Sequence, residues 1–149
     1  MKKALIALAL PLSLIACGSG SDTDAVENSM EEVESASVTI VTPMNGAQIS
    51  GTQINVNLSS TVPILPAGDL TEGTGPHPLY LNAELTPADQ PVPTVPGSIV
   101  HMGDASATFT FEDVEPGDYT MIAVVADGVH VPLQPWVVDT VTFTVVSGN

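Results

Sequence analysis

Basic side chains are almost absent from the 149-residue sequence, whose only two are Lys2 and Lys3, against 17 acidic residues. From Cys17 onward the chain has no Lys and no Arg, so it can form no conventional Lys/Arg salt bridge. Its stability must therefore come from apolar burial and backbone hydrogen bonds. Without cationic groups to replace the counterions of a phosphate backbone, a nucleic acid is all but excluded as a partner.

Cysteine occurs once, at Cys17, and a single thiol excludes an intrachain disulfide. The residues before it are two lysines and an apolar stretch from Ala4 to Ala16, which ends in a small residue. This stretch is shorter than the about 20 apolar residues that a membrane-spanning helix needs. The order of these features resembles a bacterial lipoprotein signal peptide, residues 1–16, with its lipobox. The resemblance implies cleavage before Cys17 and acylation of its thiol.

An acylated Cys17 would anchor the protein in a lipid bilayer, because acyl chains bury methylene groups there. Gly18, in place of Asp after the cysteine, resembles the pattern sorted to the outer membrane of Gram-negative bacteria. This implies a lipid-anchored protein of the cell envelope that faces the periplasm. The alternative is an ordinary secretory signal followed by an incidental cysteine.

Residues 17–37 contain no basic residue and are rich in Gly, Ser, Thr and acidic side chains. This composition favours a disordered, self-repelling acidic linker between the anchor and a folded domain. A weak amphipathic helix from Ala25 to Glu34 is the alternative, but it would have no basic face with which to lie on anionic lipid.

Helix signals are missing from residues 38–149, where short alternating patterns predict β-strands. The run "TPMNGAQISGTQINVNLSS" has apolar Ile54, Val56 and Leu58 separated by asparagines, and it resembles the opening of many bacterial immunoglobulin-like domains. Further strand patterns lie at residues 38–41, 78–85, 107–111, 119–126 and 141–145. Six or seven short strands predict an all-β, immunoglobulin-like β-sandwich.

Two features within the predicted sandwich indicate its interior. Residues 122–126 are apolar at every position, which predicts a central strand covered on both faces. The segment Pro-Gly-Asp-Tyr that ends at Tyr119 resembles the tyrosine corner of such folds. The Pro-rich and Gly-rich stretches at residues 61–76 and 87–97 are then long loops, where a β-sandwich usually carries its function.

Histidine occurs three times, in the segments "GTGPHPLYLN", "SIVHMGDASATFTFEDVEPGDYT" and "DGVHVPLQPWVVDTVTFTV", as His77, His101 and His130. These segments resemble an uncharacterised family of bacterial exported β-domains. That family has a histidine cluster after Gly-x-Gly, a His-x-His-[FL]-Gly segment and an Asp-Gly-x-His segment. The resemblance covers residues 38–146 and implies an envelope-located immunoglobulin-like fold, without a settled activity. This chain departs from the pattern because each segment keeps only one histidine.

Three imidazoles that converge at one end of a sandwich would suit copper or zinc. Met102 offers a thioether next to His101, although adjacent side chains of a strand point to opposite faces, so both could bind one metal only from a loop. Asp104 and Asp127 are candidate acceptors that would orient a ligating ring. The alternative is that each histidine bonds to backbone in a loop while Met102 lies in the core.

The densest acidic patch of the domain comprises Glu112, Asp113, Glu115 and Asp118. Either a weak calcium site or a solvated turn accounts for such a patch. Its spacing does not match that of an EF-hand loop.

Signals for catalysis are missing as well. No Ser lies in a nucleophile-elbow pattern, and the lack of Lys and Arg removes the usual clamps for phosphate or carboxylate substrates. We therefore expect a protein that is not an enzyme. Two functions remain open: a non-catalytic module that contacts an envelope protein or the cell surface, and a periplasmic binder of copper or zinc.

Overall fold

The computed structural model describes residues 35–66, 68–71, 74–102 and 104–148, and the fold is given for these residues. The expected signal peptide, Cys17 and most of the expected linker lie outside them. The described part contains β-strands and no helix, and hence no helix long and apolar enough to cross a membrane. The strands are β1 (Val38–Thr42), β2 (Ala47–Ser50), β3 (Ile54–Ser60), β4 (Pro78–Leu81), β5 (Ile99–His101), β6 (Thr108–Phe111), β7 (Gly117–Val124) and β8 (Val138–Val146).

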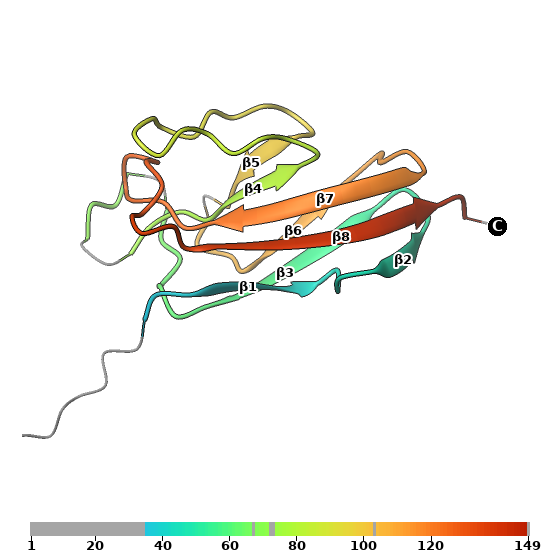
Figure 1. The fold of residues 1–149 in the computed structure, drawn as a ribbon, viewed down its shortest axis with the longest axis horizontal. Helices are drawn as coiled ribbons and strands as arrows, with labels where there is room; N and C mark the ends of the chain where they lie inside the picture. Colours follow the sequence, from blue (N-terminus) through green and yellow to red (C-terminus); the bar gives the residue numbers. More distant parts are fainter. Residues whose placement is uncertain (1–34, 67, 72–73, 103, 149) are drawn as a thin grey trace, which may run out of the picture. The chain divides into compact units, whose positions relative to one another are not determined.

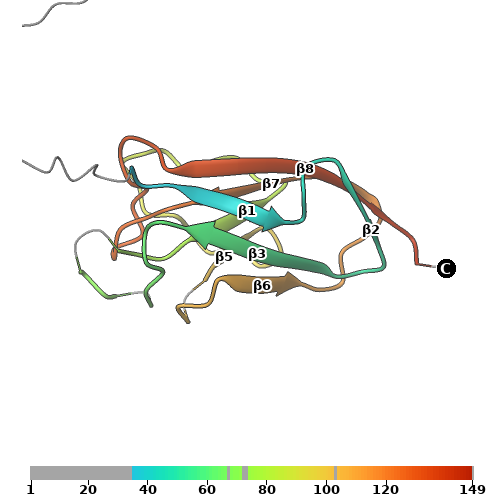
Figure 2. The ribbon, with the colours of Figure 1, turned by 90° about the horizontal axis from the view of Figure 1, so that it is seen from below.

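The strands form two sheets that pack as a sandwich (Figures 1 and 2). One sheet has three strands in the order β1-β3-β6, and the other has five in the order β2-β8-β7-β4-β5. All neighbours are antiparallel except β2 and β8, which are parallel. The prediction of an all-β sandwich is confirmed. The described strands number eight rather than six or seven, because β2, which directly follows the turn at Gly46, and β5, which has three residues, gave no alternating pattern of their own.

The main core lies between the two sheets and follows from strand alternation. In β3 the alternating residues Ile54, Val56 and Leu58 are buried, and the asparagines between them are exposed. They pack with residues of the facing sheet such as Leu79 and Met121. Burial of each such side chain stabilises the fold by about 1.5–3 kcal/mol relative to leaving it exposed.

A second, smaller cluster covers the outer face of the five-stranded sheet. It contains Tyr80, Val92, Ile99 and Val124. Because Leu79 belongs to the main core and Tyr80 to this cluster, the two clusters lie on opposite faces of β4. Val92 belongs to the loop between β4 and β5, so this loop is the outer cover of the sheet (Figure 1). The central position of β7, with both faces covered, agrees with its predicted role.

The tyrosine corner forms as the sequence indicates. The Tyr119 hydroxyl donates to the carbonyl oxygen of Glu115 at 2.8 Å. The Tyr119 ring also stacks on Phe143 of β8, with the ring centroids 5.8 Å apart. These contacts fix the turn that leads into β7.

Candidate functional site

The loop between β7 and β8 holds His130, and Asp127 determines its shape. The Asp127 Oδ1 atom accepts hydrogen bonds from the backbone N–H groups of Val129 and Val131, at 3.0 and 2.9 Å. The His130 N–H donates to the Asp127 carbonyl at 2.8 Å. His130 itself has a φ of 68°, in the left-handed region that few non-glycine residues adopt. Asp127 therefore positions His130 through the backbone, and its carboxylate is engaged by amides rather than by an imidazole.

Two glycines hold this loop against the segment that precedes β4. A Cβ atom on Gly75 would collide with the carbonyl of Ala126, and one on Gly128 would collide with the carbonyl of Asp69. The Ala126 N–H also donates to the Pro76 carbonyl at 3.1 Å. These close backbone contacts fix the start of the loop, and with it the position of His130.

His101 is the last residue of β5 and lies on the outer face of the five-stranded sheet. It shares this face with Ile99, two residues earlier, which packs in the outer cluster. The loop between β4 and β5 reaches the same place, because the Val92 N–H donates to the His130 carbonyl at 2.9 Å. Strand β5, this loop and the loop of His130 therefore meet at one point.

At this point the rings of His101 and His130 stack on each other. Their centroids are 4.4 Å apart and their planes are inclined by 26°. The Nε2 atom of each ring is buried and has no hydrogen-bond partner among the residues that the structure describes. A buried polar atom without a partner costs about 1–3 kcal/mol. Two such atoms on stacked rings are the feature of this fold that most clearly indicates a ligand.

The His101 ring is neutral at physiological pH. Burial lowers its pKa from the usual 6.5, and the neighbouring His130 lowers the pKa further, while hydrogen bonds to the backbone of Pro93 and Val92 act in the opposite direction. The Nε2 atom has no hydrogen-bond partner among the described residues. In a neutral imidazole one nitrogen carries the proton and the other carries a free lone pair, which can bind a ligand.

His77 lies elsewhere, between the two sheets, and both of its ring nitrogens have partners. Its Nδ1 is 3.0 Å from the Gly75 carbonyl oxygen, and its Nε2 is 2.9 Å from the hydroxyl oxygen of Ser60 on the facing sheet. The side chain is fully buried, which lowers its pKa. The three histidines expected to converge thus divide into one stacked pair and one residue bonded inside the sandwich.

The other candidate ligands do not join the pair. Met102 is buried in the main core, on the opposite side of the strand from His101, as alternation requires. Asp104 is exposed, and its Oδ1 accepts a hydrogen bond from the Ser106 N–H at 3.0 Å, which makes it a turn residue. The described residues contain no group of three or more His, Cys, Asp or Glu side chains that could hold a metal ion. The described residues therefore also show no group of side chains that could form the calcium site considered for the acidic patch.

Sequence reasoning missed the contribution of Val92 and Pro93. They contact His101 through the backbone, and a backbone group leaves no signature in the residue type. The sequence did predict a long Pro-rich loop at residues 87–97. It gave no indication of which side chains this loop would cover.

The fold and the site thus define an all-β sandwich that carries a stacked pair of partly buried imidazoles. Residues 54–146 match the family described as Domain of unknown function (DUF4399). Because the match covers more than half of the sequence, the chain belongs to this family, which agrees with the resemblance to an uncharacterised family. No curated protein sequence and no solved structure matches the chain significantly.

Proposed function

We propose that this protein is a non-catalytic, lipid-anchored protein of the cell envelope whose β-sandwich binds Cu(I) through His101 and His130. The observation that carries the copper site is the pair of buried Nε2 atoms without partners on two stacked rings. A bound cation would satisfy both atoms at once. It would thereby remove a cost that the fold otherwise bears.

The electrostatics of the pair favour a metal ion over a proton. Metal ions bind the neutral form of imidazole, and burial together with the neighbouring ring keeps the pKa of His101 below its usual value. The 17 acidic residues of the chain, opposed by only Lys2 and Lys3, also raise the local concentration of cations.

The number of ligands favours Cu(I) over Zn²⁺. Zinc sites in proteins use three or four protein ligands. The described residues offer the two imidazoles and no third His, Cys, Asp or Glu beside them. Cu(I) is a d¹⁰ ion that is stable with two nitrogen ligands, so it matches what the chain provides.

Binding of one ion by both rings requires a change in the stack. The lone pair of an imidazole lies in the ring plane, and the two planes are inclined by only 26°. One ring must therefore turn before both nitrogens reach the same ion. We assign this movement to His130, because it belongs to a loop whereas His101 belongs to a strand.

Titration of the folded domain with Cu(I) against a colorimetric Cu(I) chelator tests the site. We expect one ion per domain. His130→Asn removes one ligand and keeps a residue that tolerates the left-handed backbone, and His101→Phe removes the other ligand and keeps a ring in the stack. Each should weaken binding by roughly 100-fold or more, since even the loss of a group that only orients a ligand costs 10–100-fold.

The matched control is Met102→Leu, which removes the thioether that follows His101 in the sequence and preserves the packing of the core. Its affinity for Cu(I) should equal that of the natural sequence. Absence of binding by the natural sequence, or equal binding by the two histidine variants, would contradict the copper site.

Lipid anchoring rests on the order of the signal peptide, residues 1–16, and Cys17. Mass spectrometry of the protein purified from bacterial membranes should show a chain that begins at an acylated Cys17. A Cys17→Ala variant should remain uncleaved and lack the acyl mass. An unmodified chain that retains residues 1–16 would contradict anchoring by lipid, and would leave the copper site to be judged by its own test.

Contact with another envelope protein is the second candidate function. It is favoured by a separate feature, a cleft at the open edge of the sandwich.

A further inference from the structure

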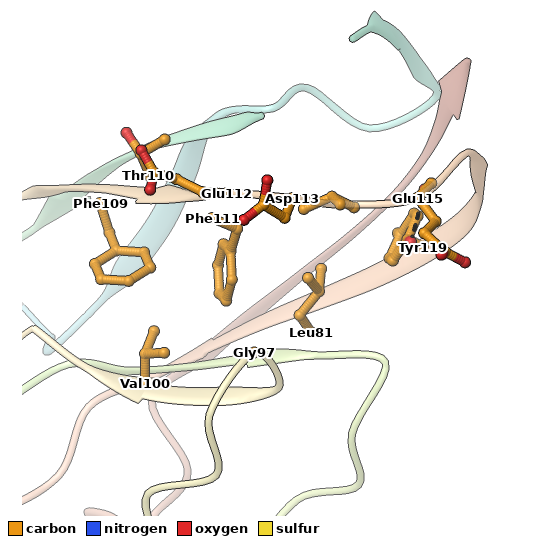
Figure 3. Close-up of a pocket in the computed structure, with 11 residues that line it drawn as sticks. Leu81, Gly97, Val100, Phe109, Thr110, Phe111, Glu112, Asp113, Glu115 and Tyr119 are labelled. Atoms are coloured by element: carbon orange, nitrogen blue, oxygen red, sulfur yellow. Dashed lines mark hydrogen bonds between the residues drawn. The ribbon is translucent and has the colours of Figure 1, made fainter. Parts of the chain in front are cut away.

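A cleft of about 470 Å³ opens between the two sheets along β5 and β6. Strand β6 is an edge strand of the three-stranded sheet, and β5 is an edge strand of the five-stranded sheet. Phe109 and Phe111 of β6 point across the cleft toward Val100 of β5 and Leu81 of β4 (Figure 3). The two Phe rings meet edge to face, with centroids 5.0 Å apart. Phe111 and Leu81 are buried beneath the cleft, whereas Phe109 and Val100 are partly exposed to it, so its lining combines apolar and polar groups. Its size is that of a pocket for a few side chains.

Carboxylates line one end of this cleft. Glu112, Asp113 and Glu115 follow β6 directly and are exposed. Among the described residues, their hydrogen bonding to other side chains is limited to one contact of 3.5 Å, between Gln53 and Glu112. The described residues contain no Lys or Arg that could pair with these carboxylates, because the only two basic residues of the chain are Lys2 and Lys3. A cation that pairs with these carboxylates would come from another molecule.

Besides the cleft and the carboxylates, the backbone of β6 offers a third feature that a partner could bind. Within the described part of the chain β6 pairs with β3 on one side and with no strand on the other. A free strand edge offers N–H and C=O groups to an added extended segment, and the side chains of that segment then alternate between the cleft and solvent.

We propose that the cleft binds an extended segment of a partner protein in which Lys or Arg alternates with apolar residues. The segment adds to the free edge of β6, its inward apolar side chains pack on the partly exposed Phe109 and Val100, and its cationic groups pair with the three carboxylates. A second copy of this domain is excluded as the occupant because it is itself acidic and carries no Lys or Arg. This site is independent of the copper site.

The test uses the full mature chain and a pool of eight-residue peptides that alternate Lys or Arg with Val, Leu or Phe. Binding is measured by nuclear magnetic resonance, with amide shifts expected at residues 108–115. The triple variant Glu112→Gln, Asp113→Asn, Glu115→Gln should weaken binding roughly tenfold, because exposed charge pairs contribute about 0.2–1 kcal/mol each. A matched control, Glu84→Gln, Asp89→Asn, Asp104→Asn, removes the same charge away from the cleft and should change binding less than about twofold.

Two further peptide pools separate strand addition from simple charge attraction. The first has the same side chains with N-methylated backbone amides, which cannot pair with β6 and should not bind. The second has Glu in place of Lys and Arg, and should also fail to bind. Absence of binding by the first peptide pool, equal binding by the N-methylated pool, or shifts confined to residues outside 99–119 would overturn the proposal.

Discussion

His77 and His101 show how two residues of one type acquire different roles from their surroundings. Burial lowers the pKa of both, so both are neutral at physiological pH. His77 has partners at both ring nitrogens and joins the two sheets through Ser60. His101 has a buried Nε2 without a partner and a second imidazole stacked on it. We therefore propose a structural role for His77 and ligand binding for His101.

We expect the domain to lose stability as the pH falls below 6.5. The folded-state pKa values of His77 and His101 lie below 6.5, the value of an unperturbed histidine, so between the two values the unfolded chain binds protons that the folded chain does not. The stability is therefore fully present above pH 6.5 and is lost as the pH falls toward the folded-state pKa values. Urea denaturation at pH 7.5 and pH 5.5 measures this change.

The control for this experiment is His77→Gln. Glutamine can hydrogen-bond to Gly75 and Ser60 but does not titrate, so the variant should lose less stability between the two pH values than the natural sequence. A denaturation midpoint that stays constant or rises as the pH falls would show that neither histidine is buried in its neutral form.

At the scale of the element, alternation predicted six of the eight described strands, including the four-residue strands β4 and β6, and missed β2 and β5. Ile54, Val56 and Leu58 in β3 gave a clear pattern, and so did the apolar run at the end of β7. Strand β2 has only two apolar positions, Ala47 and Ile49, and directly follows the turn at Gly46, and β5 has only three residues. The architecture could therefore be predicted, whereas the edge of the five-stranded sheet at β5 could not.

Strand β5 was not predicted from the sequence, and this explains why the arrangement of the three histidines was not predicted. The sequence indicated three histidine-bearing segments but not the face on which each ring lies. Without β5 there was no basis for placing His101 on the outer face, with Met102 on the inner face. The alternation of β4 did indicate where His77 lies. His77 is two residues before Leu79 and so points to the same face, which is buried between the sheets. The left-handed backbone of His130 had no counterpart in the sequence.

At the scale of the whole molecule, the dominant property is an excess of negative charge that no basic residue of the domain offsets. The formal net charge is −15. Repulsion among exposed carboxylates opposes the compact state and is screened over about 8–10 Å at physiological ionic strength. The interior stabilises the fold instead, through the two hydrophobic clusters and the backbone hydrogen bonds of the sheets. This balance also predicts a source that is marine or salt-tolerant.

We accordingly expect the melting temperature to rise with ionic strength. Between about 0.01 and 0.15 M NaCl the Debye length falls from about 30 to 8 Å, and relief of about 1 kcal/mol of repulsion raises the melting temperature by roughly 4–8 °C for a domain of this size. Differential scanning calorimetry at pH 7.5 measures the change, and sucrose at matched osmolality serves as the uncharged control. A melting temperature that does not depend on salt would mean that charge repulsion has little influence on this fold.

The central claim is that His101 and His130 together form a two-nitrogen site for a monovalent metal ion. X-ray absorption at the copper edge of the Cu(I)-loaded domain tests it most directly, because it reports the number and type of atoms bound to the ion. We predict that the copper ion has two imidazole nitrogens and no sulfur as neighbours. In His130→Asn the spectrum should show one imidazole nitrogen fewer. A sulfur neighbour, or a spectrum identical in the natural sequence and in that variant, would contradict the claim.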